Sequence, residues 1–92
     1  MSYRIRVVDL RTNRIKWTPL KGGYLGVYEA SHPQLALMIA EGVLQMAGEE
    51  IIDMSPVAFS LEDGGSLTGI LVSGVKIGAV VEGAEIVSFS PG

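Results

Sequence analysis

Few residues in this 92-residue sequence have side chains that could carry out chemistry. His32 is the single histidine, and cysteine is absent. A zinc site would therefore hold at most one imidazole and otherwise carboxylates, which is a poor ligand set for that metal. The sequence also has no Gly-x-Ser-x-Gly motif that would expose a catalytic serine. We expect no metal and no other cofactor.

Carboxylates form two groups whose spacing acid–base catalysis could use, namely Glu49-Glu50 with Asp53, and Glu62-Asp63. Both groups fall at the ends of expected elements, where solvated charges commonly gather. His32 falls in the expected first turn of a helix, whose positive end disfavours protonation of the imidazole, and a structural role is typical there. The sequence thus assigns no catalytic residue and favours a protein that is not an enzyme. A small enzyme with a site built between subunits is an alternative.

The segment Lys21-Gly22-Gly23-Tyr24-Leu25-Gly26 is rich in glycine, as a phosphate-binding loop would be. A P-loop requires Gly-x-x-x-x-Gly-Lys-Ser/Thr, and the dinucleotide motif requires Gly-x-Gly-x-x-Gly leading directly into a helix. The segment contains neither motif, and residues 24–28 have the pattern of a short strand that separates the glycines from the helix. We interpret the segment as a flexible connection.

Charge is distributed unevenly along the chain. Residues 1–21 contain six cations and one carboxylate, a net charge of +5, whereas the rest of the chain carries −8. The basic end could bind an anionic ligand such as nucleic acid, or it could dock against the acidic part of the same or a neighbouring molecule. Six cations spread over two strands make a thin patch for nucleic acid, so docking is favoured. The anion-binding candidates under the first interpretation are Arg4, Arg6, Arg14 and Lys16.

The length allows one domain, residues 1–92, with a single hydrophobic core. The N-terminal residues lead directly into an alternating pattern without an apolar signal sequence. No segment has the roughly 20 consecutive apolar residues that a membrane-spanning helix needs. We therefore expect a cytoplasmic protein without a membrane partner.

Residues 31–48 form the only segment that is long and periodic enough to predict a helix. Ser31 and Gln34 have the spacing of a capping box, Pro33 suits the first turn, and Gly48 suits the C-terminal end. The polar side chains between these ends are confined to one narrow stripe, formed by Gln34, Glu41 and Gln45. Because the rest is apolar, the helix is expected to be covered on more than one side. It is a central core helix, a helix that packs on a partner chain, or both.

Residues 3–10 and 15–20 have strand patterns and flank a predicted turn at Thr12-Asn13. The resulting hairpin register pairs Leu10 with Ile15, Val8 with Trp17, and Asp9 with Lys16. In this register apolar residues point to both sides of the hairpin. We expect either a bulge near Val7-Val8 or a hairpin that is covered on different sides at its two ends.

Beyond Ser55-Pro56, which we interpret as a break, the sequence predicts four strands at residues 57–62, 67–72, 75–81 and 84–90. Glycine-containing turns join them into an antiparallel meander. The three turns agree on one continuous apolar face, which we expect the helix to cover. The residues predicted to be buried there against Leu37, Met38 or Leu44 are Phe59, Ile70, Ile77 and Ile86.

The opposite face of the meander is also rich in apolar residues, and the predicted register places Gly69 directly opposite Gly78. A solvated face would carry more polar side chains. Either the N-terminal hairpin folds back over this face or a second subunit lies on it. The interface candidates are Leu67, Gly69, Leu71, Gly78, Val80, Val87 and Phe89.

The order of hairpin, helix and strands, ending in Val81-Glu82-Gly83-Ala84-Glu85-Ile86-Val87-Ser88-Phe89, resembles the ubiquitin-like β-grasp sulfur carriers of thiamin and molybdopterin synthesis. This resemblance implies a β-grasp fold and a carrier or adaptor function. Those carriers end in Gly-Gly, the site of adenylation and thiocarboxylation, whereas this sequence ends in Ser90-Pro91-Gly92.

Together these features predict an α+β domain with an N-terminal β-hairpin, one central apolar helix and a C-terminal four-stranded antiparallel meander. We expect a small half-open barrel or two-layer sandwich, with a β-grasp-like sheet as the alternative. The expected function is that of a small non-enzymatic subunit that forms homo-oligomers or docks into a larger complex through apolar sheet and helix surfaces. The alternatives are a β-grasp carrier or adaptor, and anion or nucleic-acid binding through the basic N-terminal hairpin.

Overall fold

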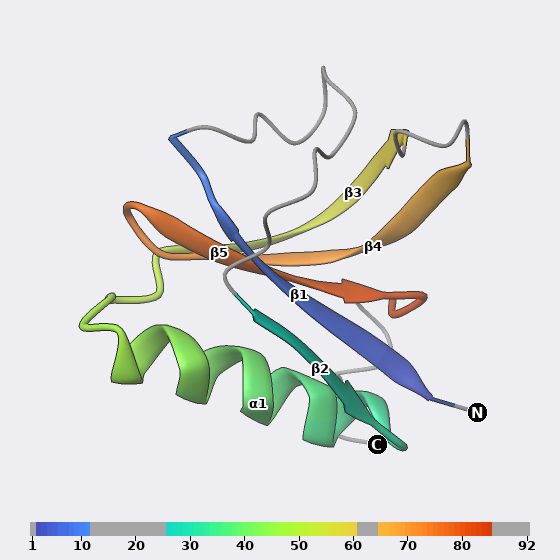
Figure 1. Cartoon of the computed structure of the whole chain (residues 1–92), viewed down its shortest axis with the longest axis horizontal. Helices are drawn as coiled ribbons and strands as arrows, with labels where there is room; N and C mark the ends of the chain where they lie inside the picture. Colours follow the sequence, from blue (N-terminus) through green and yellow to red (C-terminus); the bar gives the residue numbers. More distant parts are fainter. Residues whose placement is uncertain (1, 12–25, 61–64, 86–92) are drawn as a thin grey trace.

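The computed structural model describes residues 2–11, 26–60 and 65–85. Its elements in chain order are β1 (Tyr3–Asp9), β2 (Gly26–Ala30), α1 (Pro33–Met46), β3 (Asp53–Ser60), β4 (Ser66–Ser73) and β5 (Ile77–Glu82). The strands form one antiparallel sheet in the order β2-β1-β5-β4-β3, and α1 runs along one face of it (Figure 1). Within the described residues the sheet is open, with β2 and β3 at its edges. The predicted α+β class, with an N-terminal hairpin and a central helix, is confirmed.

α1 begins at Pro33, so its N-cap is His32 and not Ser31. The His32 backbone is extended and its carbonyl accepts the first helical hydrogen bond, from the Ala36 N–H at 2.9 Å. The His32 side chain makes no capping hydrogen bond, and the predicted capping box, which has Ser31 as the N-cap, does not fit a helix whose N-cap is His32. Pro33 explains the shift, because proline is favoured at the first helical position, where its missing N–H leaves no donor unpaired.

The C-terminal end of α1 agrees with the prediction. Gly48 has a φ of +81°, a left-handed conformation that glycine adopts readily. The Gly48 N–H donates to the Gln45 carbonyl at 3.0 Å, and the Glu49 N–H donates to the Leu44 carbonyl at 2.9 Å. This pair of bonds is a Schellman motif, which satisfies carbonyls that the helix end would otherwise leave unpaired. α1, the helix found in the described residues, lacks the length and continuous apolar sequence needed to span a membrane.

β1 is an inner strand with a partner on each side. Tyr3 lies opposite Ala30 of β2, and Val8 lies opposite Gly78 of β5. The described hairpin partner of β1 is therefore β2. The strand predicted at residues 15–20 lies outside the described residues, as do the partners predicted there for Val8, Asp9 and Leu10.

The described part of the meander has three strands, not four. β1 occupies the place beside β5 that we expected for residues 84–90; Ala84 and Glu85 are not in a strand, and residues 86–92 lie outside the described part. β3 starts at Asp53 and continues through Ser55-Pro56, so the predicted break is wrong. Proline is tolerated at this position because β3 is an edge strand of the described sheet, where a missing N–H does not interrupt a ladder on both sides.

The main hydrophobic core lies between α1 and the sheet. Ile5 of β1, Leu44 of α1 and Val81 of β5 are fully buried in it. Ala36 and Ala40 are also fully buried, and their small side chains let α1 lie close to the sheet. The other buried members are Val7, Ala30, Ile70, Val72, Ala79 and Ala84. The prediction that one face of β4 and β5 packs toward the helix is thus confirmed.

The predicted face of β3 is wrong. Val57 lies opposite Gly69 and Phe59 lies opposite Leu67, whereas Ile70, on the helix side, lies opposite Pro56. A register that differs by an odd number of residues exchanges the two faces of a strand, so Val57 and Phe59 belong to the face away from α1. The predicted burial of Ile70 is confirmed, whereas Met38, predicted to cover the sheet, is 67% exposed. Ile86 lies outside the described residues.

The face of the sheet away from α1 has buried apolar residues of its own. They are absent from the helix-side core, yet each is at most 9% exposed: Val8, Val57, Leu71 and Val80. β1 keeps a regular register through Val7 and Val8, so it has no bulge there. Val7 and Val8 are both buried, so both faces of β1 are covered. The predicted pairing of Gly69 with Gly78 is wrong, because Gly69 lies opposite Glu82 and Gly78 opposite Ser73.

Candidate interaction surface

Part of the side of α1 that faces away from the sheet is apolar. With 3.6 residues per turn, Leu35, Met38, Gly42 and Met46 fall within about 80° of one another, on the side opposite the buried Leu44. Leu35 is 42% exposed, Met38 67% and Met46 91%. A surface helix normally presents polar residues on this side. We call these four residues the outward face of α1.

Gly42 lies in the middle of the outward face, and nothing within the described molecule explains it. A Cβ built on Gly42 would have no heavy atom within 4 Å, so no neighbouring group requires the absence of a side chain. Glycine inside a helix costs about 1 kcal/mol relative to alanine. Gly42 therefore lowers the stability of α1, and no packing contact within the single chain requires it. A close approach by another molecule would explain the glycine.

The two ends of α1 lack the usual electrostatic complements. The first turn contains no acidic residue and the last turn no basic residue. Two carboxylates, Glu49 and Glu50, follow the C-terminal end, which already carries the negative pole of the helix dipole. The Glu49 carboxylate accepts hydrogen bonds from the backbone N–H groups of Lys76 and Ile77, whereas Glu50 is exposed.

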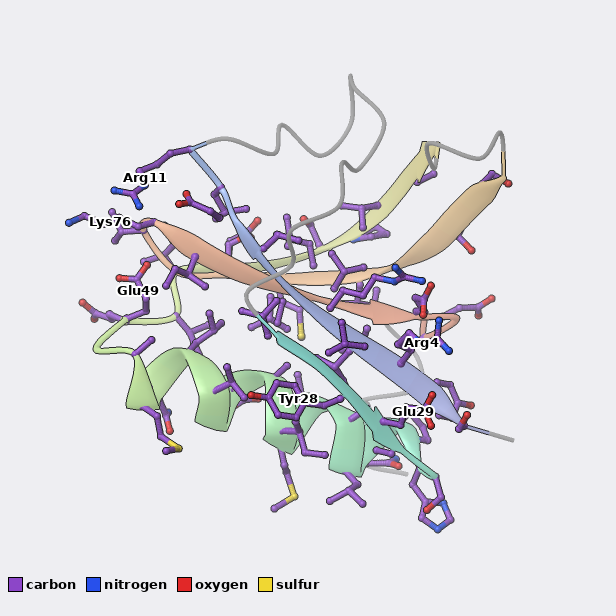
Figure 2. All side chains as sticks on the ribbon, viewed as in Figure 1. Arg4, Arg11, Tyr28, Glu29, Glu49 and Lys76 are labelled. Carbon is purple, nitrogen blue, oxygen red and sulfur yellow. The ribbon has the colours of Figure 1, made fainter. Side chains whose placement is uncertain are left out.

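The described basic residues of β1 form ion pairs within the chain. Arg6 and Glu82 approach to 3.1 Å, with both side chains mostly buried, and Arg4 lies 3.8 Å from Glu82 and 3.4 Å from Glu29. Figure 2 shows Arg4 and Glu29 side by side, consistent with their register on β1 and β2. The basic strand therefore docks on acidic residues of the same molecule. The other two anion-binding candidates, Arg14 and Lys16, lie outside the described residues.

A second group of charges gathers at the other end of β1. Arg11 donates to Asp9 from its backbone N–H at 2.9 Å and from its guanidinium at 2.8 and 3.0 Å. These hydrogen bonds lower the pKa of Asp9 to about 2 and raise the pKa of Arg11. The backbone N–H groups of Lys76 and Ile77 lower the pKa of Glu49 in the same way. Arg11, Glu49 and Lys76 lie at one end of the molecule (Figure 2). The Glu49 contacts join the residues after α1 to the start of β5, whereas the Asp9–Arg11 pair is local to the end of β1. Both sets of contacts have a structural character.

Several interface candidates predicted on the outer sheet face are buried within the single chain. Val80 is fully buried and Leu71 is 9% exposed, and Gly69 and Gly78 are buried too. Leu71 and Leu10 converge over Gly78, since a Cβ on Gly78 would lie 2.9 Å from Leu71 Cδ1 and 3.0 Å from Leu10 Cδ2. Leu71 and Val80 are thus already covered within the single chain. Val87 and Phe89 lie outside the described residues, and Leu67 belongs to β4.

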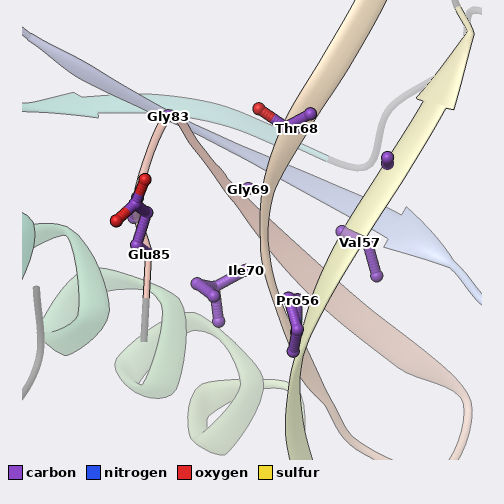
Figure 3. A pocket seen from close by; sticks show the side chains of 9 residues that line it. Pro56, Val57, Thr68, Gly69, Ile70, Gly83 and Glu85 are labelled. Atoms are coloured by element: carbon purple, nitrogen blue, oxygen red, sulfur yellow. The ribbon is translucent and has the colours of Figure 1, made fainter. Parts of the chain in front are cut away.

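A cavity of about 510 Å³ is lined by residues of β3 and β4 and by residues 83–85 (Figure 3). Apolar side chains and backbone form most of its lining, and the polar side chains come from Thr68 and Glu85. One hydroxyl and one carboxylate do not by themselves identify a reaction. Among residues 2–11, 26–60 and 65–85, no three histidine, cysteine or carboxylate side chains gather as metal ligands would. The cavity therefore does not define a reaction.

Sequence reasoning identified α1 as apolar almost all round, but it did not single out Leu35, Met38 and Met46 as the part left uncovered. The sequence signal available for the solvent side of α1 was the position of the polar stripe. That stripe does not coincide with the side opposite Leu44, so it did not identify the uncovered residues.

Comparisons with protein-family models, with curated proteins and with solved structures find no match to this chain.

Proposed function

We propose that this chain is a small, non-enzymatic interaction subunit that docks on another protein surface through the outward face of α1. The observation that carries this proposal is the exposure of Leu35, Met38 and Met46 on one side of a helix whose buried residues pack against the sheet. Neighbouring apolar side chains left in water favour association, because covering them removes apolar surface from the solvent.

The chemistry of the outward face supports a binding role. Two of its three exposed side chains are methionines, which are unbranched, flexible and polarizable, and which are common on surfaces that adapt to a partner. The polar stripe of Gln34, Glu41 and Gln45 borders this face and would form a solvated rim. An apolar centre with a polar rim is the usual composition of a protein–protein interface.

The other candidate surfaces, which are the opposite sheet face and the basic residues of β1, already make contacts within the chain. This supports the choice of α1. The apolar residues Val8, Val57, Leu71 and Val80 on the opposite sheet face are already buried within the chain. Arg4 and Arg6 pair with Glu29 and Glu82, which leaves less positive charge for phosphate binding. Nucleic-acid binding through β1 is therefore disfavoured relative to docking through α1.

A photo-crosslinking amino acid placed at Met38 tests this function in cells that produce the protein naturally. We expect covalent adducts at a defined mass from Met38, and none from Val27, a control position on β2 that is 50% exposed on the face away from α1. Met46→Lys in the same chain should remove the adducts by placing a charge in the docked face. Equal labelling from both positions, or no adduct from Met38, would contradict the proposal.

A further inference from the structure

We infer that the partner of the outward face of α1 is a second copy of this chain, bound so that the two α1 helices run antiparallel and cross at Gly42. This inference rests on the proposed function and specifies its partner. It is carried by the arrangement of residues about Gly42, by the empty space beside Gly42, and by the charges at the two helix ends.

The outward face is self-complementary about Gly42. In a two-fold pair of antiparallel helices, each residue meets the residue that lies equally far on the other side of the crossing point. Met38 precedes Gly42 by one turn and Met46 follows it by one turn. Met38 would therefore pack against Met46 of the partner subunit, on both sides of the axis, so that the two most exposed large apolar side chains of α1 cover each other.

Gly42 would lie at the crossing point itself. Two glycines facing each other let helix backbones approach closely, because no Cβ holds the axes apart. The space around Gly42 is open, with no heavy atom within 4 Å of the position that a Cβ would take, and this is where the partner's glycine would enter. The dimer thus gives a packing reason for a glycine that the single chain does not explain.

The helix ends favour an antiparallel pair over a parallel one. The positive end of α1 has no carboxylate in its first turn, and the exposed Glu50 lies just beyond its negative end. In an antiparallel pair the positive end of each helix lies near Glu50 of the partner subunit. A parallel pair would instead bring the two Glu50 side chains together. The charges of one chain therefore complement those of an identical chain turned by two-fold symmetry.

The size of the contact sets the expected strength. A helix of 14 residues is about 21 Å long, so a pair of such helices buries less than a standard interface. Contacts of that size belong to weak or transient complexes, and we expect a dissociation constant of about 10 µM or weaker. The dimer should therefore appear at high concentration and dissociate on dilution.

Sedimentation equilibrium of the purified chain over a range of concentrations tests this inference. Wild type should pass from monomer to dimer, and Gly42→Gln should weaken the dimer by at least about tenfold, because its long side chain occupies the crossing point. Gly42→Gln should also unfold at a temperature no lower than wild type, since glutamine is the better helix former. Glu41→Gln, on the polar stripe, is the matched control and should leave the dimer unchanged. A wild type that stays monomeric at about 1 mM, or a dimer that survives Gly42→Gln, would overturn the inference.

Single-cysteine variants test the antiparallel register, because the natural chain contains no cysteine. A short bis-maleimide added to a mixture of Met38→Cys and Met46→Cys should join the two variants to each other. Either variant alone should crosslink less, since two copies of the same position lie about 12 Å apart along antiparallel helices. Efficient crosslinking of Met38→Cys with itself and not with Met46→Cys would indicate a parallel pair and overturn the register.

The failure of this inference is distinguishable from failure of the proposed function. A monomeric chain whose Met38 probe still forms an adduct with a different protein would overturn the second copy as partner and leave the interaction function in place. If Gly42→Gln does not weaken the dimer and the Met38 probe forms no adduct, both the inferred dimer and the proposed function are overturned.

Discussion

The carboxylate of Glu49 accepts a hydrogen bond from the backbone N–H of Ile77 at 2.8 Å. The same oxygen accepts the N–H of Lys76, so a residue just after α1 holds the turn that precedes β5. Gly74 makes room for this contact, because a Cβ at Gly74 would lie 2.8 Å from Glu49 Cβ. One side chain thereby fixes the C-terminal end of the helix to the sheet.

Glu49→Gln should lower the urea midpoint of unfolding more than the control Glu50→Gln. Both substitutions remove a negative charge near the helix end, but Glu49 alone accepts the two backbone hydrogen bonds in the described structure. These bonds lower the pKa of Glu49, so its contribution to stability is present above the ordinary carboxyl pKa and is lost as the pH falls through the lowered value. The difference between the two variants should accordingly shrink in acid. Equal midpoints at neutral pH would show that the contact contributes nothing.

Asp9 should titrate with a pKa of about 2 in the folded protein, against an ordinary value of 3.8. The cause is the set of hydrogen bonds from the Arg11 guanidinium and N–H, which favour the ionised carboxylate. Stability from this pair is therefore complete above pH 3.8 and decreases as the pH falls toward 2. NMR titration of the Asp9 side chain measures the value directly.

Arg11→Gln should raise the Asp9 pKa toward its ordinary value, whereas Arg4→Gln should not, because Arg4 pairs with Glu29 and Glu82. An unchanged Asp9 pKa in Arg11→Gln would mean that another group holds this carboxylate ionised.

The features that were predictable from the sequence are those with a strong local signal. The apolar period and Gly48 indicate the extent of α1 to within two residues at each end. The alternation of Ile70 with Val72 and of Ile77 with Ala79 identifies the helix side of β4 and β5. Local backbone preference and side-chain period determine such features, so a single sequence is enough to recognise them.

The errors arise where the structure depends on contacts distant in sequence. A register that differs by an odd number of residues moves Val57 and Phe59 to the other face of β3, although the local strand pattern is the same. Pro56 does not break β3, because β3 is an edge strand of the described sheet. The edge position depends on the order of all the strands, which a local sequence pattern does not contain. The place of β1 beside β5 joins the two ends of the chain, and no local signal encodes it. For the same reason the sequence could not indicate which side of an apolar α1 remains uncovered.

Gly69→Ala should destabilise the protein more than Gly78→Ala. A Cβ at Gly69 would collide with the backbone carbonyl oxygen of Val81 and lie 2.9 Å from its carbonyl carbon, and a sheet backbone yields little. At Gly78 the closest atoms are the flexible ends of Leu71 and Leu10. We expect a loss of about 3 kcal/mol or more at Gly69 and about 1–2 kcal/mol at Gly78, measured by urea unfolding. A smaller loss at Gly69 than at Gly78 would show that β5 can shift away from β4.

Leu71→Glu should abolish the cooperative unfolding transition, and the control Val27→Glu should preserve it. Both residues belong to the face of the sheet away from α1, but Leu71 is 9% exposed whereas Val27 is 50% exposed. An ionised carboxylate beside Val80 and Gly78 would be buried without a hydrogen-bond partner provided by the present packing, and this costs several kcal/mol, a large fraction of the stability of a small domain. Circular dichroism during urea titration, with light scattering of the same samples, measures both folding and mass. If Leu71→Glu instead gave a folded monomer from a larger wild-type assembly, Leu71 would be covered by a second subunit in solution, and the contact between copies would lie on the sheet and not on α1.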